Sequence, residues 1–310
     1  MTTSSSQETQ QEKVTPHLET TTLHIKRILA ATDLSEQATL ALEFAARLAK
    51  QFHSRLHLLY TVMPQLYIAN TAVLSAEVQK VEIDRAQEEL RRYASKIAEL
   101  RTLRHEEIAL CGPTIDAIDE LVEMKGIDLL VMGSHGRSGL GKMMLGSVAE
   151  AAIRRLHCPV LVVGPHCARR LDPLKPMLLA TELPAGSLRA AQYAMSFARE
   201  ATAPLTVVHV LPERVQEMGY AGVSVKDKVA EELRQLVPHD PELRKHVHFE
   251  IATGKPAEEI VRAAKNCKAG LIVMGAREHT VLADHAQWAT LSDVIRESHC
   301  PVFVVSSHFV

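Results

Sequence analysis

The stretch from Val131 to Val148 reads VMGSHGRSGLGKMMLGSV, and it says more about the function of this chain than any other part of the sequence. It begins within a short apolar run, Ile127–Met132, which has the length and composition of a buried strand. It ends near Ser147, where a helix can begin. The loop between them is rich in glycine, which lets a backbone approach a ligand closely because it has no Cβ. Free N–H groups in a loop and at a helix N-terminus bind anions, so the stretch predicts a phosphate-binding loop.

Two familiar phosphate motifs do not fit this loop. The run Gly136–Lys142 matches the start of a P-loop, but Met143 stands where a serine or threonine would hold Mg²⁺. The dinucleotide pattern built on Gly139 and Gly141 requires a glycine at Met144. That pattern also belongs to the first strand–helix turn of a domain, whereas this strand comes late in its domain.

The chain repeats itself, and the repetition predicts its domain organisation. The segment Ile127–Gly133 is echoed by Ala269–Gly275, and His157–Val163 is echoed by His299–Val305; both pairs are 142 positions apart. Two copies of one unit therefore follow each other. We expect a disordered tail over 1–23, a first domain over 24–165, a linker over 166–173 and a second domain over 174–310.

Each unit alternates apolar runs of strand length with segments of helical periodicity. Five strands alternating with four helices predict a parallel sheet that is covered on both faces and doubly wound. Ligands of such sheets lie beyond the carboxyl ends of the first and fourth strands, which Asp33 and Gly133 follow. In the first unit we expect strands at Arg27–Ala31, Leu56–Val62, Glu107–Leu110, Leu129–Met132 and Val160–Val163, and one long helix over Val81–Leu100.

The spacing of Gly133, Gly136, Gly146 and Ser147 reads G-x-x-G, nine residues, then G-[ST]. This pattern resembles the ATP-binding signature of the universal stress protein family. The resemblance implies two tandem, doubly wound five-stranded α/β domains of the adenine-nucleotide alpha hydrolase-like fold. A glycine-rich turn that binds nothing is the alternative interpretation of the same residues.

The resemblance also implies roles for residues outside the signature. An acid at the position of Asp33 lies against the nucleoside, although a helix N-terminal acid is the plainer alternative. A backbone contact to adenine falls at Thr61, and Met132 packs on the adenine face or belongs to the core. Arg137 either reaches a phosphate or is a solvated loop residue. The full predicted ATP site, with Mg²⁺ or Mn²⁺ as counter-ion, is Asp33, Thr61, Met132, Gly133, His135, Gly136, Arg137, Gly146, Ser147 and Val148.

The second unit departs from the signature. Glu278 stands at the position of Gly136, Trp288 at that of Gly146 and Ala289 at that of Ser147. A carboxylate repels a polyphosphate, and we expect the indole to fill space that a glycine leaves open. Repeat two is therefore expected to keep the fold and to lack the nucleotide.

Composition excludes several classes of function. A formal net charge of −2 argues against a basic surface for nucleic acid, and a content of only 4% aromatic residues argues against base stacking. Five cysteines without regular spacing suit a reducing compartment. We find neither a membrane-spanning apolar run nor a signal peptide, and no histidine or cysteine spacing typical of a protein metal site. These features favour a cytoplasmic location.

We therefore expect a nucleotide-dependent stress or regulatory protein with an unknown protein partner. A weak ATPase and a nucleotide-free structural scaffold are the alternatives. No obvious base is available to activate water, so the chain is expected not to be an enzyme, or to hydrolyse ATP very slowly. The family resemblance implies pairing through the last strands, either between the two repeats of one chain or between two chains as a homodimer.

Overall fold

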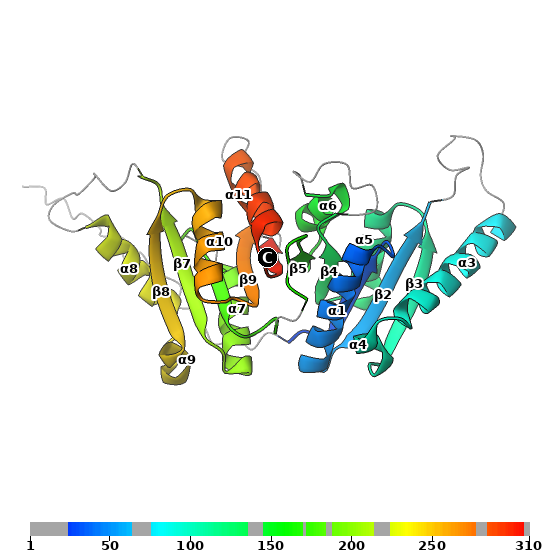
Figure 1. Cartoon of the computed structure of the whole chain (residues 1–310), viewed down its shortest axis with the longest axis horizontal. Coiled ribbons are helices and arrows are strands. Elements are labelled where there is room, and N and C mark those ends of the chain that lie inside the picture. The colour runs from blue at the N-terminus through cyan, green and yellow to red at the C-terminus, as the bar shows by residue number, and fades with distance from the viewer. Residues whose placement is uncertain are drawn as a thin grey trace, which may run out of the picture.

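The computed structural model describes residues 24–63, 76–135, 145–169, 172–183, 188–213, 224–276 and 284–306. Within these ranges the chain forms two α/β repeats that stand side by side (Figure 1). The predicted fold class is confirmed. Repeat one comprises β1 (Arg27–Thr32), α1 (Glu36–Gln51), β2 (Arg55–Val62), α3 (Ala76–Ala94), α4 (Ala98–Arg101), β3 (His105–Cys111), α5 (Thr114–Lys125), β4 (Leu129–Gly133), α6 (Ser147–Arg155) and β5 (Val160–Val163).

Repeat two has the same order of strands and principal helices. Its turn after the first strand copies that of repeat one: the Leu34 amide donates to the Thr32 hydroxyl, and the Leu183 amide donates to that of Thr181. The repeat comprises β6 (Met177–Ala180), α7 (Leu188–Ala201), β7 (Leu205–Leu211), α8 (Val225–Leu236), α9 (Pro241–Lys245), β8 (Val247–Thr253), α10 (Pro256–Asn266), β9 (Leu271–Ala276), α11 (Asp284–Glu297) and β10 (Val302–Ser306).

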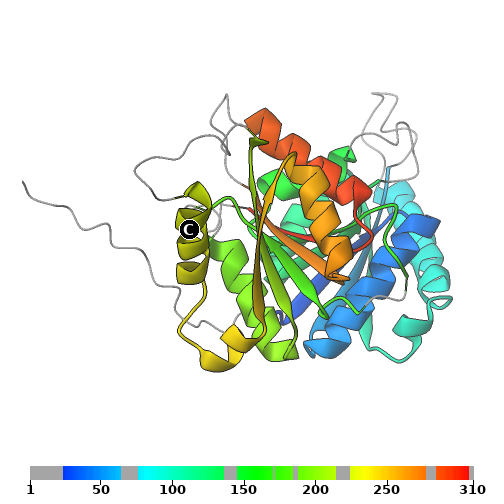
Figure 2. The same cartoon turned by 60° about the vertical axis from the view of Figure 1, so that its left-hand side comes forward.

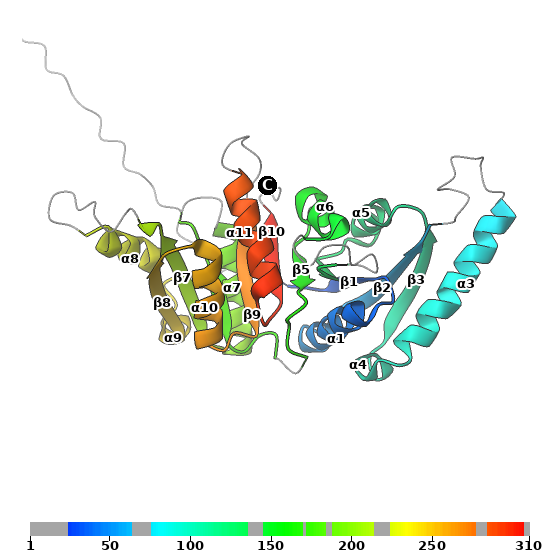
Figure 3. The same ribbon diagram turned by 45° about the horizontal axis from the view of Figure 1, so that its top comes forward.

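The ten strands of the described residues form one sheet, in the order β3-β2-β1-β4-β5-β10-β9-β6-β7-β8. Neighbouring strands within each repeat are parallel, whereas β5 and β10 pair antiparallel, with Leu161 opposite Phe303. Figure 3 shows these two strands at the junction of the repeats. The expected pairing of the last strands is therefore present inside one chain. Both edges of β5 and of β10 are occupied, so a homodimer through these strands would require an exchange of partners.

Helices cover both faces of the sheet because the strands carry apolar side chains on both faces. One face packs against α1, α3 and α7, and the other packs against α5, α6, α10 and α11. Figure 2 shows α7 (green) and α10 (orange) on opposite sides of the strands of repeat two. The hydrophobic core on each face of the sheet extends through both repeats. The rings of Phe52 and Phe197, one from each repeat, lie 5.3 Å apart. The repeats thus share their cores as well as their sheet.

Helix α1 begins at Glu36 and is capped by the side chain of the preceding residue. The hydroxyl of Ser35 caps it by accepting a hydrogen bond from the Ala38 amide at 3.1 Å, which satisfies one free N–H of the first turn. The predicted helix over Val81–Leu100 is wrong in extent, because α3 starts earlier and ends at Ala94, and α4 follows separately. The break buries the side chain of Ile97, whose backbone is extended.

No helix among the described ranges is both long and apolar enough to span a bilayer.

Candidate nucleotide site

The site lies beyond the carboxyl ends of β1 and β4, at the upper end of repeat one in Figure 1. The two strands are hydrogen-bonded neighbours, and the chain leaves them toward opposite faces of the sheet, which opens a cleft between the outgoing loops. A cavity of about 210 Å³ is found there. Its lining includes eight of the predicted residues: Asp33, Thr61, Met132, Gly133, His135, Gly146, Ser147 and Val148.

The turn after β1 fixes the carboxylate of Asp33. Leu34 has a positive φ of 62°, and its amide donates to the Thr32 hydroxyl at 3.0 Å. Oδ1 of Asp33 accepts from the Ser35 amide at 3.0 Å. Oδ2 of Asp33 is buried and has no hydrogen-bond partner among the described residues. One oxygen therefore holds the turn, and the other is left to accept a bond from a ligand hydroxyl.

Gly146 closes the loop that follows β4. Its amide donates to the Ser134 carbonyl at 2.8 Å, and a Cβ on Gly146 would lie only 2.8 Å from that same oxygen. A side chain would therefore push the two ends of the loop apart. Gly133 differs, because a Cβ there would meet nothing closer than the His135 carbonyl at 3.5 Å, an ordinary contact. Of these two glycines, only Gly146 is required by a close approach of the backbone.

Helix α6 supplies N–H groups to the cavity. Gly146 is its N-cap and makes no side-chain cap, so the amides of the first turn, beginning at Ser147, have no partner inside the helix. The partial positive charge of a helix N-terminus favours an anion at this place. Residues 136 to 144 fall outside the described ranges, so Gly136 and Arg137 of the predicted site are not placed.

The wall opposite the loop is formed by Thr61 and Thr114. Their hydroxyls are 2.7 Å apart, which ties the end of β2 to the start of α5. Met132 contributes a largely buried side chain. Sequence reasoning missed Thr114 and also Ser134, both of which line the cavity. Thr114 follows the carboxyl end of β3, and the rule that ligands bind at strand ends could have singled it out.

His135 lies at the start of the loop, with Nδ1 2.9 Å from the Ser134 hydroxyl. Its Nε2 is buried and unpartnered among the described residues. Among the described residues, two polar atoms of the cavity lack partners, a ring nitrogen and the Asp33 oxygen, and they lie beside first-turn amides that have no partner within α6. A carboxylate for a hydroxyl and amides for phosphates are the groups that a nucleotide needs, so the described residues fit one. They include no cluster of three metal-ligating side chains.

Repeat two builds the corresponding region differently. Helix α11 starts at Asp284, so Trp288 lies inside the helix, whereas Gly146 precedes α6. The indole of Trp288 lies under the guanidinium of Arg154, 4.1 Å from ring centre to Cζ, across the junction between the repeats. The side chain that was expected to fill the second site thus contacts repeat one. Glu278 lies outside the described residues.

Comparison with known proteins agrees with this architecture. The family model described as "Universal stress protein family" matches residues 24–164 and 173–306. The chain therefore belongs to the universal stress protein family and carries two copies of its domain.

Single-domain and two-domain relatives are both found. Universal stress protein MJ0531 of Methanocaldococcus jannaschii is 35% identical over 44% of this chain and 81% of its own length. Universal stress protein Slr1230 of Synechocystis is 23% identical over 90% of this chain and 99% of its own length. The crystal structure of a universal stress protein from Archaeoglobus fulgidus superposes with a TM-score of 0.67 at 24% identity, covering 92% of this chain and 99% of that one. That likeness concerns the fold.

Proposed function

We propose that repeat one binds one molecule of ATP, with Mg²⁺ or Mn²⁺, and that its occupancy regulates the binding of a protein partner during a cellular stress response in the cytoplasm. The observation that carries the proposal is Oδ2 of Asp33, which is buried without a partner in the described part of the chain and lies in a cavity bordered by the start of α6. Burial of a polar atom without a partner is costly, and a ligand hydroxyl would offset that cost.

Different residues of the cavity would contact different parts of the nucleotide. Asp33 would accept from the nucleoside, and Thr61 and Met132 would border the base. The amides from Gly133 and from Ser147 onward would hold phosphates, with Gly136 and Arg137 completing the loop. The metal ion would supply positive charge to the phosphates. Family membership and the signature spacing support this assignment.

Gly136→Glu tests the proposal, because it imports the residue that repeat two carries at this position. We expect calorimetry with ATP and Mg²⁺ to show binding to the parent chain and none to the variant, with unchanged unfolding midpoints. Equal affinity of the two proteins would refute the assignment. Mass spectrometry of gently purified protein would test the scaffold alternative, which predicts that no adenine nucleotide accompanies the chain.

A weak ATPase is the second candidate, and the observation that favours it is Nε2 of His135, which has no partner within the ranges that the structure describes. We propose that any hydrolysis is far slower than the ~1–10³ s⁻¹ of ordinary enzymes, because amides that hold phosphates stabilise ground and transition states alike. Steady-state phosphate release, with His135→Ala and Ser147→Ala as controls, decides the matter. Release near one per second that is lost in either variant would establish an ATPase.

A further inference from the structure

Three arginines stand in a row at the amino ends of three neighbouring strands. Arg27 of β1 is in register with Arg55 of β2. Leu56 is in register with His105 of β3, so Arg55 lies beside Arg104, the residue that precedes β3. Adjacent strands are about 4.8 Å apart, which brings the bases of these side chains close together. The row lies at the edge of the sheet opposite the nucleotide cavity, toward α4 at the lower end of Figure 1.

Among the described residues, one member of this row has a carboxylate partner and two have none. Nε of Arg27 lies 4.0 Å from Oδ2 of Asp128. Within the described part of the chain, Arg55 and Arg104 make no ion pair and no side-chain hydrogen bond. Like charges on neighbouring strands repel each other. Arg55 and Arg104 are therefore neighbouring guanidinium groups that no carboxylate of the described residues compensates.

The two arginines border a groove of about 860 Å³. Lys50 also lines it, and its amine donates to the Thr102 hydroxyl at 2.9 Å, a neutral partner that leaves the positive charge uncompensated. Ala49, Leu56 and Leu103 give the groove an apolar wall. A groove with three cations and an apolar wall is suited to an anion that carries an organic group.

The glutamate that lines the groove, Glu106, already has partners of its own. Both oxygens of Glu106 accept from the Lys125 amine at 3.0 Å, and one also lies 2.7 Å from Nδ1 of His57. Burial raises the pKa of Glu106, but the hydrogen bonds from Lys125 and His57 outweigh it and lower the pKa overall. Glu106 is therefore ionised, and its negative charge is compensated by Lys125 and His57 rather than by the arginines. His57 also lines the groove; it is 8% exposed, and its Nε2 is buried without a partner among the described residues.

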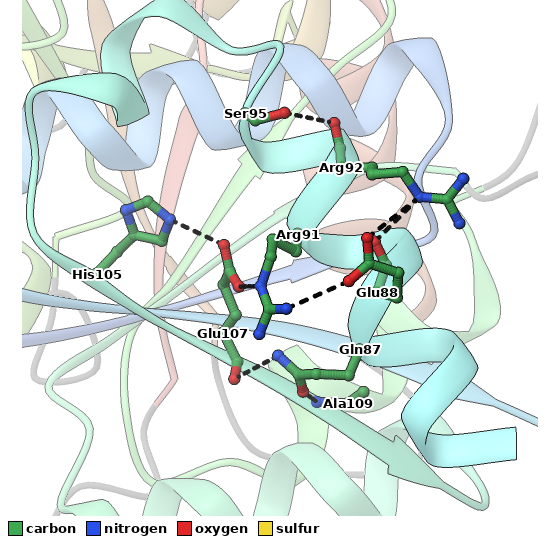
Figure 4. Close-up of polar contacts among 8 residues, drawn as sticks. All are labelled: Gln87, Glu88, Arg91, Arg92, Ser95, His105, Glu107 and Ala109. Carbon is green, nitrogen blue, oxygen red and sulfur yellow. Dashed lines mark hydrogen bonds and ion pairs between the residues drawn. The ribbon is translucent and has the colours of Figure 1, made fainter. Parts of the chain in front are cut away.

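A neighbouring hollow of about 660 Å³ lies on the α3 side of Arg104, and its acidic side chains are paired with cations. Figure 4 shows the polar contacts on this side. There Arg91 lies 3.2 Å from Glu88 and 3.6 Å from Glu107, and Nε2 of His105 lies 3.4 Å from Glu107. The carboxylates on this side are thus engaged with their own cations. They do not compensate Arg55 or Arg104.

Repeat two serves as an internal comparison. At equivalent positions it has Pro204 for Arg55, Thr206 for His57 and His246 for Arg104, yet it forms the same strands. The fold does not need the arginines. A function limited to repeat one explains their presence better than a structural requirement does.

We propose that this groove binds a phosphate-bearing small molecule, with Arg55 and Arg104 as its main ligands and Lys50 and His57 at its border. Guanidinium groups bind phosphate oxygens in paired hydrogen bonds, and two adjacent guanidinium groups match a dianion. The groove is separate from the nucleotide cavity and does not depend on the proposed ATP binding.

The test uses the full chain and inorganic pyrophosphate as the probe, titrated by calorimetry. Gly136→Glu serves as the starting protein, so that the candidate nucleotide loop does not contribute. We expect Arg55→Gln with Arg104→Gln to weaken pyrophosphate binding at least tenfold. The matched control is Arg85→Gln with Arg92→Gln, which removes the same charge from α3, where both arginines are exposed and paired with glutamates.

An unchanged affinity in the groove variant, or an equal loss in the α3 control, would overturn the proposal. Arg104→His is a second variant. It introduces the residue that repeat two has at this position, His246, and repeat two forms the same strands. The variant should weaken binding at pH 8, where an unperturbed histidine is neutral. Retention of full affinity in this variant would also count against the proposal.

Discussion

The guanidinium of Arg154 lies over the ring of Trp288, 4.1 Å from its centre, and this contact joins the two repeats. Arg154 is near the end of α6, the helix whose start borders the nucleotide cavity, and Glu150 of the same helix accepts from its Nε at 3.0 Å. Trp288 occupies in repeat two the position of Gly146 in repeat one. The helix of the candidate site therefore contacts one of the residues by which the second copy departs from the signature.

Arg154→Gln should destabilise the chain by about 0.5–1 kcal/mol, the usual strength of a partly exposed cation–π contact. Trp288 is the single tryptophan of the chain, so its fluorescence reports on this contact without interference. We expect a changed emission maximum in the native state and a lower urea midpoint. Arg92→Gln is the control, and identical spectra for Arg154→Gln and the parent would contradict the contact.

Gly146→Ala should destabilise repeat one by roughly 1–3 kcal/mol, the usual cost of forcing an extra methyl group into a packed site. The added Cβ would lie 2.8 Å from the Ser134 carbonyl that closes the loop. Gly133→Ala is the matched control, because its Cβ would make only an ordinary contact, and its stability should be nearly unchanged. Urea unfolding measures the stability of both variants. Equal losses of stability would show that the close approach of the backbone does not explain the need for glycine at position 146.

Asp33→Asn should lower the affinity for ATP at least tenfold. A hydrogen bond to a charged group contributes about 1.5–3 kcal/mol, and the variant removes the charge while keeping the shape. Glu182→Gln, the equivalent change in repeat two, should leave the affinity unchanged. Calorimetric titration distinguishes them, and a similar loss in both variants would mean that the effect is not local to the cavity.

Titration with ATP should saturate at one nucleotide per chain. Repeat two lacks the equivalents of Gly136, Gly146 and Ser147 and starts its helix earlier. Equilibrium binding with a labelled nucleotide counts the sites directly. A value near two would show that the second copy binds despite these changes.

The stability of the chain should depend on pH through Glu43. Burial raises the pKa of this carboxyl group above its usual 4.5, although Arg169, 2.6 Å away, acts in the opposite direction. The folded state then holds the proton more tightly than the unfolded state, so stability falls as pH rises from 4.5 through the raised pKa.

Glu43→Gln cannot titrate and removes this dependence. The free energy of unfolding of the variant, minus that of the parent, should therefore increase with pH across this window and then level off. Urea unfolding between pH 4 and pH 7.5 measures the difference, and the exposed Glu36→Gln on the same helix is the control. A difference that decreases with pH would contradict a raised pKa for Glu43.

The two-repeat organisation and the doubly wound class of each repeat could be predicted from the sequence. Hydrophobic periodicity and the spacing of 142 positions between the repeats are properties of the sequence, and they can be recognised without knowing the conformation of the loops. The sequence also indicated the region of the site, because Asp33 and Gly133 follow strands that must be neighbours in such a sheet. The extent of α3 was mispredicted, since the burial of Ile97 depends on packing rather than on local periodicity.

The contacts between distant segments could not be predicted from the sequence and are seen only in the folded chain. The hydrogen bond between Thr61 and Thr114, the contact of Arg154 with Trp288 and the alignment of Arg55 with Arg104 each depend on strand register or on how helices pack across the junction. Local sequence does not fix the register between strands that are tens of residues apart, because register is set by how whole faces bury their apolar side chains. The candidate nucleotide cavity could be located from the sequence, but the arginine groove became visible only once the strands were placed side by side.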